Sequence, residues 1–303
     1  DNSMVTISSN RLAKYDFPVG TNPVDIAISP DKQLLVTANY TENSLSVVAL
    51  APFAALIAQP PTPPTSDPKN ATPPPQAKLT PSKVETSAGP SKIIFSPDGK
   101  YLLCANKTAR SLSVFKNEQG TLKLVKNVDI QVSPNDIDIF RTANLVIISS
   151  FTDRGFVVIN YSDLINEKGN LIRPSYIERS GSISALAVSY ATNNILAANM
   201  NAIALFPDGL ESLIRNSSQL PIPSEGKNSD VSFSNNGDVA VAVNETMNRA
   251  VVIRFNQQTP IGTGVLNKNI ANINFNVIGQ INTGFSPSRV FVEADGSYAI
   301  TVN

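Results

Sequence analysis

The stretch VDIAISPDKQLLVTAN, residues 24–39, has the form of two adjacent strands joined by a tight turn. Apolar residues alternate along its first half, Ser-Pro-Asp can reverse the chain, and a second apolar run ends on Asn39. Six copies of this form occur, and the second strand ends on asparagine in five of them. The copies begin at VDIAISPD (24–31), SKIIFSPDGK (91–100), NDIDIF (135–140), SALAVS (184–189), SDVSFSNNGD (229–238) and SRVFVEADGS (288–297).

The spacing of the copies predicts an all-β, six-bladed β-propeller with four antiparallel strands in each blade. The second residues of successive copies are 67, 44, 49, 45 and 59 positions apart, which fits a four-stranded unit with variable loops. The sixth copy stops after two strands, and MVTIS (4–8) and RLAKYDF (11–17) can supply the other two. We therefore expect the N-terminal strands to pair with the C-terminal blade, because such closure leaves no open sheet edge.

Two long segments carry a family resemblance. PVGTNPVDIAISPD…LLVTANYTENSLSVV (18–48) and GPSKIIFSPDGKYLLCANKTARSLSVF (89–115) resemble the YVTN-type β-propeller repeat of surface-layer, periplasmic and lactonase-like propellers. The resemblance implies a propeller fold and leaves activity open, since propellers host many unrelated functions. Many family members have seven blades, so seven blades is the alternative to the six copies counted.

The amino-acid composition limits the kinds of partner and the cellular locations that are expected. Lys and Arg number 24 and Asp and Glu number 24, so the chain lacks the basic field that attracts nucleic acid. No apolar run approaches the ~18 residues that a membrane span needs. Charged residues make up only 16%, which favours an extracellular, cell-surface or periplasmic location. The single cysteine, Cys104, lies in the apolar run YLLCAN and is expected to be a buried core residue.

One Pro-rich insertion, residues 51–83, interrupts the first blade of what we interpret as a single domain, residues 1–303. Prolines at this density cannot enter a strand ladder, so the segment is expected to extend outward. It is either a tolerated surface insertion or a docking arm for a protein partner or a second subunit. The anchors of that docking arm would be Phe53, Leu56, Ile57, Pro60 and Pro61.

The residue types exclude several chemistries. The chain has no histidine, one cysteine and no Gly-rich phosphate loop. These absences disfavour His-assisted nucleophilic catalysis, imidazole or thiolate metal sites and nucleotide phosphate binding. No catalytic residue and no cofactor is therefore assigned.

Carboxylates and basic residues remain, and they recur at one position of the copies. That position is expected at the mouth of the propeller channel and holds Asp25, Lys92, Asp136, Ala185, Asp230 and Arg289. Opposite charges on neighbouring blades could form structural salt links. The alternative is a polar pocket for a sugar or lactone, or a Ca²⁺ site made by Asp25, Asp136 and Asp230.

Two further positions are expected to be structural. The residues that alternate along each first strand are apolar in every copy, which predicts a core between blades. The asparagines that end the second strands are expected to bond the backbone of the following turn. They are Asn39, Asn106, Asn199, Asn244 and Asn303.

These observations favour a non-enzymatic, exported β-propeller that acts as a protein-binding or assembly scaffold. The alternative is a lactonase-like sugar-lactone hydrolase or isomerase that uses the channel carboxylates, with or without a divalent cation.

Overall fold

The computed structural model describes most of the chain. The residues described are 4–8, 14–52, 79–141, 144–150, 155–167, 172, 174–178, 182–207, 209–215, 220–256 and 274–303. The chain divides into two compact units, residues 1–129 and 130–303, and each is described by itself. The proposed docking-arm residues Phe53, Leu56, Ile57, Pro60 and Pro61 lie outside the described residues.

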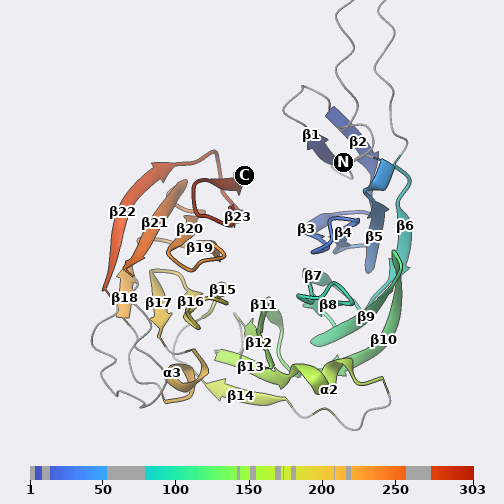
Figure 1. Cartoon of the computed structure of the whole chain (residues 1–303), viewed down its shortest axis with the longest axis horizontal. Coiled ribbons are helices and arrows are strands. Elements are labelled where there is room, and N and C mark those ends of the chain that lie inside the picture. Colours follow the sequence, from blue (N-terminus) through green and yellow to red (C-terminus); the bar gives the residue numbers. More distant parts are fainter. Residues whose placement is uncertain are drawn as a thin grey trace, which may run out of the picture. The chain divides into compact units, whose positions relative to one another are not determined.

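The first unit contains two four-stranded antiparallel sheets and a two-stranded hairpin (Figure 1). Sheet one consists of β3 (Pro23–Ile28), β4 (Leu34–Asn39), β5 (Ser44–Ala49) and β6 (Ser82–Glu85). Sheet two consists of β7 (Pro90–Phe95), β8 (Tyr101–Asn106), β9 (Ser111–Glu118) and β10 (Thr121–Asp129). The hairpin joins β1 (Met4–Ser8) to β2 (Lys14–Pro18).

The second unit contains three four-stranded sheets, a strand pair and two short helices. Sheet three consists of β11 (Pro134–Phe140), β12 (Leu145–Ser150), β13 (Gly155–Asn160) and β14 (Ser175–Glu178). Sheet four consists of β15 (Ala185–Val188), β16 (Ile195–Ala198), β17 (Ala202–Phe206) and β18 (Leu220–Pro223). Sheet five consists of β19 (Asn228–Phe233), β20 (Val239–Asn244), β21 (Arg249–Asn256) and β22 (Asn274–Asn282). β23 (Arg289–Val292) pairs with β24 (Ala299–Val302), and the helices are α2 (Tyr161–Ile165) and α3 (Leu210–Arg215).

Each four-stranded sheet is a meander in which strands adjacent in sequence are adjacent in space. In sheets one, two and five, the turn between the first two strands is closed by a serine hydroxyl that accepts a backbone N–H. Ser29 Oγ accepts the Leu34 N–H at 2.9 Å, and Ser96 Oγ accepts the Tyr101 N–H at 2.9 Å. The repeat seen in the sequence is thus a repeat of sheets.

The core lies between neighbouring sheets of each unit, as the apolar positions predicted. In the first unit, Leu34 and Val36 of sheet one pack with Ile93 and Phe95 of sheet two. In the second unit, sheets four and five share a similar cluster. Ile28 is an exception, since it ends β3 and is 55% exposed.

Two predictions about single features can be compared with the described residues. Cys104 is completely buried, which confirms its expected core position. Within the described part of the chain, no helix is long and apolar enough to cross a membrane.

Candidate functional site

The structure places three of the predicted channel-mouth residues between neighbouring sheets. Asp25, Asp136 and Asp230 are 8%, 2% and 5% exposed. Each follows a register irregularity at the start of its strand. Each carboxylate accepts a backbone N–H from the first strand of the next sheet or strand pair: Ile93 at 2.8 Å, Leu186 at 2.8 Å and Val290 at 2.9 Å.

These bonds have a simple origin in the pairing pattern. The first strand is an edge of its sheet, and in an antiparallel pair alternate residues point their N–H groups away from the partner strand. The Ser96 N–H bonds the Tyr101 oxygen, so by alternation the Ile93 N–H points out of sheet two. We name Asp25, Asp136 and Asp230 the inter-sheet aspartates, because each satisfies such an outward N–H.

The other predicted channel-mouth residues occupy the equivalent position without a carboxylate. Lys92 lies on β7, Ala185 begins β15 and is fully buried, and Arg289 begins β23. In the described residues, no group of three or more His, Cys, Asp or Glu side chains could hold a metal ion.

Sheet three carries a second contact of the same kind, which is half-buried. Asp138 accepts the Val188 N–H at 2.8 Å and the Tyr190 hydroxyl at 2.7 Å. The Arg141 guanidinium lies 4.3 Å from the centre of the Tyr190 ring. Burial raises the pKa of Asp138 to about 6, and burial together with the Asp138 charge raises the pKa of Tyr190.

At the turn between the second and third strands, sheets one and two are filled by small polar side chains. Asn106 Nδ2 donates to the hydroxyls of Ser113 at 2.8 Å and Ser111 at 3.3 Å. In sheet one, Asn39 Nδ2 donates to Ser44 at 3.1 Å and Ser46 at 2.9 Å. Asn39 and Asn106 therefore bond serine hydroxyls of the third strand, a partner that the sequence did not predict.

Sheet five has the same register but different residues. Asn244 pairs with Arg249 and Ala242 with Val251, where sheet two pairs Asn106 with Ser111 and Cys104 with Ser113. Without the two serines, Asn244 Nδ2 donates to the Glu225 carbonyl at 2.5 Å and to Ser224 Oγ at 3.3 Å. Its Oδ1 accepts the Met247 N–H at 2.8 Å, which is the predicted bond to the turn.

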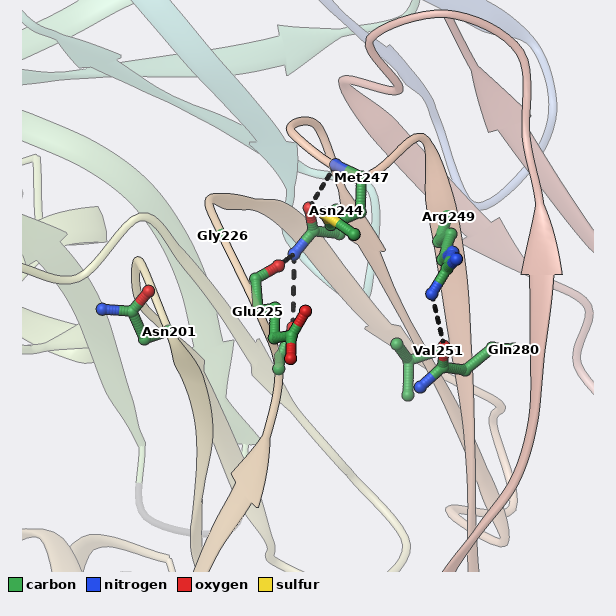
Figure 2. A pocket seen from close by; sticks show the side chains of 9 residues that line it. Asn201, Glu225, Gly226, Asn244, Met247, Arg249, Val251 and Gln280 are labelled. Atoms are coloured by element: carbon green, nitrogen blue, oxygen red, sulfur yellow. Dashed lines mark hydrogen bonds between the residues drawn. The ribbon is translucent and has the colours of Figure 1, made fainter.

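A cleft of about 510 Å³ opens at this point between sheets four and five; we name it the sheet-five cleft. Figure 2 shows Glu225 between Asn201 and the bonded Arg249–Gln280 pair, with Met247 beside Asn244. Arg249 donates an N–H to Gln280 Oε1 at 3.1 Å. The lining residues are Asn201, Ser224, Glu225, Gly226, Asn244, Met247, Arg249, Val251 and Gln280.

Sheet three has a smaller counterpart at the equivalent turn. Ser150 pairs with Gly155 there, and a cavity of about 140 Å³ is lined by both together with Val157, Tyr176 and Glu178. Sheets two, three and five thus differ in the residues that flank the turn between the second and third strands.

The sheet-five cleft combines one cation, one anion, amide groups and an apolar wall, which suits recognition of a small polar molecule. Its residues were not among the predicted site residues. One signal in the sequence could have indicated it: SLS recurs at 44–46 and 111–113, whereas the aligned segment of the fifth copy, 249–251, reads RAV.

Comparisons with known proteins support the propeller fold. A family model described as "Lactonase, 7-bladed beta-propeller" matches residues 65–171, about a third of the chain. A search of curated proteins found no match.

Two solved structures are similar to nearly the whole chain. A chain of Kuenenia stuttgartiensis hydrazine synthase has a TM-score of 0.70 and 14% identity, covering 99% of this chain and 86% of that one. A functionally unknown protein from Desulfotomaculum acetoxidans has a TM-score of 0.68 and 12% identity, covering 98% and 84%. At these identities the likeness concerns the fold alone. Together with the five four-stranded antiparallel sheets, it supports a β-propeller.

Proposed function

We propose that the protein is a non-enzymatic, exported β-propeller that acts as an assembly scaffold. The observation that carries this proposal is the outer strand of sheet five, β22, which presents an uncharged and partly apolar edge. A long edge strand of this kind is a template for pairing with another chain.

The other outer strands carry features that discourage pairing. β6 and β14 are four residues long and contain charged side chains, and β18 contains two prolines in four residues. β10 has nine residues, as β22 does, but includes Lys123 and Lys126. β22 reads NFNVIGQIN, without a charge or a proline, and its Val277, Ile278 and Ile281 are 43%, 49% and 59% exposed.

The occupant that fits this edge best is β22 of a second copy. Two antiparallel copies place only apolar and amide side chains opposite one another in every register, so no like charges meet. β10 would bring lysines together in the same arrangement. Such a pair is twofold symmetric, and twofold-symmetric dimers are the commonest assemblies of identical chains.

A lysine on β22 tests the assembly. Ile278→Lys places a charge on the exposed edge, and Leu124→Lys makes the same change on β10 as the control. We expect the unaltered protein and the control to be dimeric in size-exclusion chromatography with light scattering, and Ile278→Lys to be monomeric. A monomeric unaltered protein, or equal behaviour of the two variants, would contradict the proposal.

The ring is proposed to have six blades and to close by pairing of the terminal strands. The Glu293 N–H bonds the Tyr298 oxygen, so by alternation the Thr301 N–H points away from β23. If β1 pairs with β24, as proposed, Thr301→Pro should lower the free energy of unfolding by about 3 kcal/mol. If β24 is an open edge, the same substitution should change it little. Ile300→Pro, which removes a bond to β23 in either case, is the control, and urea unfolding is the measurement.

The docking arm is proposed as a second assembly contact. Deleting residues 53–78 should leave the free energy of unfolding nearly unchanged, because insertions outside strands contribute little to the core. The same deletion should weaken self-association in the light-scattering assay. Unchanged association would remove the arm from the proposal.

The match at residues 65–171 favours a second candidate, a lactonase-like sugar-lactone hydrolase. The carboxylates of this hydrolase would be Asp25, Asp136 and Asp230, with or without a bound Ca²⁺ ion. The test is hydrolysis of aldonolactones followed by pH-stat, with and without added Ca²⁺. Turnover that disappears in Asp136→Asn while the fold is retained would favour the hydrolase over the scaffold.

A further inference from the structure

We infer that the sheet-five cleft is a binding site for a short peptide with free termini. The peptide carboxylate would face Arg249 and the peptide ammonium would face Glu225. The site shares Gln280 with the proposed assembly edge β22, but its other lining residues come from the turns and inner strands of sheets four and five, and it requires no second copy.

The carboxylate end follows from the hydrogen-bonding capacity of Arg249 and Gln280. A guanidinium has five N–H donors in a planar fork that matches a carboxylate. One of these donors is used by Gln280 Oε1 at 3.1 Å. That bond also occupies the acceptor of the Gln280 amide and leaves its NH₂ group to donate beside the guanidinium. The pair therefore presents donors to an anion.

The ammonium end follows from the charges on the opposite wall. The side chain of Glu225 is exposed, and no ion pair joins it to Arg249 in the described part of the second unit. The neighbouring cation, Lys227, is bound to Glu245 at 2.6 Å. A carboxylate in this position repels a multiply charged anion such as phosphate and attracts an ammonium group. A ligand with one positive and one negative charge can interact favourably with both walls.

The volume of the cleft and its apolar wall favour a short peptide over smaller zwitterions such as a single amino acid. The cleft of about 510 Å³ lies within the range of small-molecule sites and exceeds what a single amino acid fills. Val251 is buried, and Met247 is 37% exposed. Together they offer an apolar surface to an aliphatic side chain, while the Asn201 amide can bond a peptide group.

The experiment uses the full chain and isothermal titration calorimetry with the tripeptide alanyl-leucyl-alanine. Its C-terminal amide and its N-acetyl derivative each lack one terminal charge, and D-gluconate carries a carboxylate without an ammonium. We expect saturable binding of the tripeptide and roughly tenfold to hundredfold weaker binding of each derivative. Arg249→Gln should weaken binding of the tripeptide to a similar degree while leaving the affinity for the C-terminal amide derivative unchanged. Glu225→Gln should likewise weaken binding of the tripeptide while leaving binding of its N-acetyl derivative unchanged.

Arg254→Gln is the matched control, because Arg254 is an exposed arginine of the same strand outside the cleft. It should leave binding unchanged, and circular dichroism should show that all three variants are folded. No saturable binding of the tripeptide at millimolar concentration would overturn the inference. Equal affinity for the amide, tighter binding of D-gluconate, or loss of binding in Arg254→Gln would also overturn it.

Discussion

Sheets two and five share one strand register and differ at three places. On the first strand, sheet two has Lys92 where sheet five has the inter-sheet aspartate Asp230. At the turn before the third strand, sheet two has a filled hydrogen-bond network where sheet five has a cleft. On the outer strand, sheet two has lysines where sheet five has none. A common backbone thus carries a structural bond, a proposed recognition site and a proposed assembly edge, and Gln280 of β22 belongs to both of the last two.

The largest effect is expected at the inter-sheet aspartate. Asp230→Ala leaves the buried Val290 N–H without its acceptor, so we expect the free energy of unfolding to fall by about 3 kcal/mol. Lys92→Ala, at the equivalent position of sheet two, should change it by less than about 1 kcal/mol. Urea unfolding followed by fluorescence or circular dichroism measures both. Equal losses would show that the bond from Val290 to Asp230 does not stabilise the folded protein.

The second effect concerns the filled turn of sheet two. Ser113 accepts from Asn106 at 2.8 Å and donates to Asn127 at 2.6 Å. Ser113→Val copies sheet five and breaks both bonds, so it should cost about 2 kcal/mol. Val251→Ser copies sheet two into sheet five and should cost about 1 kcal/mol or less, because Asn244 can reach the new hydroxyl. The reverse order of the two losses would contradict the comparison.

The third effect is a pH dependence of stability that arises at Asp138. Because burial raises its pKa in the folded protein from 3.8 to about 6, folding favours the protonated form. The stability that Asp138 contributes is therefore complete below pH 4 and is lost as the pH rises to 6 and above. The loss should be on the order of 2 kcal/mol. Urea unfolding of the unaltered protein and of Asp138→Asn between pH 4 and 7 tests this, and parallel pH profiles would contradict it.

The smallest effect on stability is expected at the outer strand. Replacing Lys123 and Lys126 of β10 by isoleucine gives sheet two an edge like that of β22. The free energy of unfolding should change by no more than about 0.5 kcal/mol, since these side chains are partly or fully exposed. Self-association in light scattering should nevertheless increase. No increase would show that charge is not what protects β10.

Much of the fold could be predicted because it depends on short-range patterns. The first two strands of sheets one and two lie within a residue or two of the predicted segments, since the turn residues and the alternation fix them locally. The partners of Asp25, Asp136 and Asp230 could not be predicted, because they are backbone groups of the following sheet. A pattern of side chains does not show which way an outward N–H points.

The sheet-five cleft could not be predicted for a related reason. Its walls come from turns and strands of two sheets, and Asn201 and Gln280 are far apart in the sequence. The change from SLS to RAV marks the place where the repeat is broken, yet it does not tell whether the space is filled by other side chains. Only the position of Glu225 and Gln280 in space makes the cleft polar on both walls.

The burial of Cys104 offers a practical means of measuring the proposed contact between the terminal strands. Burial raises the pKa of its thiol to about 12, so almost no thiolate is present at neutral pH and the side chain is out of reach of reagents. A cysteine introduced on the surface can therefore be labelled with a fluorophore while the native thiol stays unmodified. Distances between dyes on β1 and β24 could then be followed in single molecules without first removing Cys104.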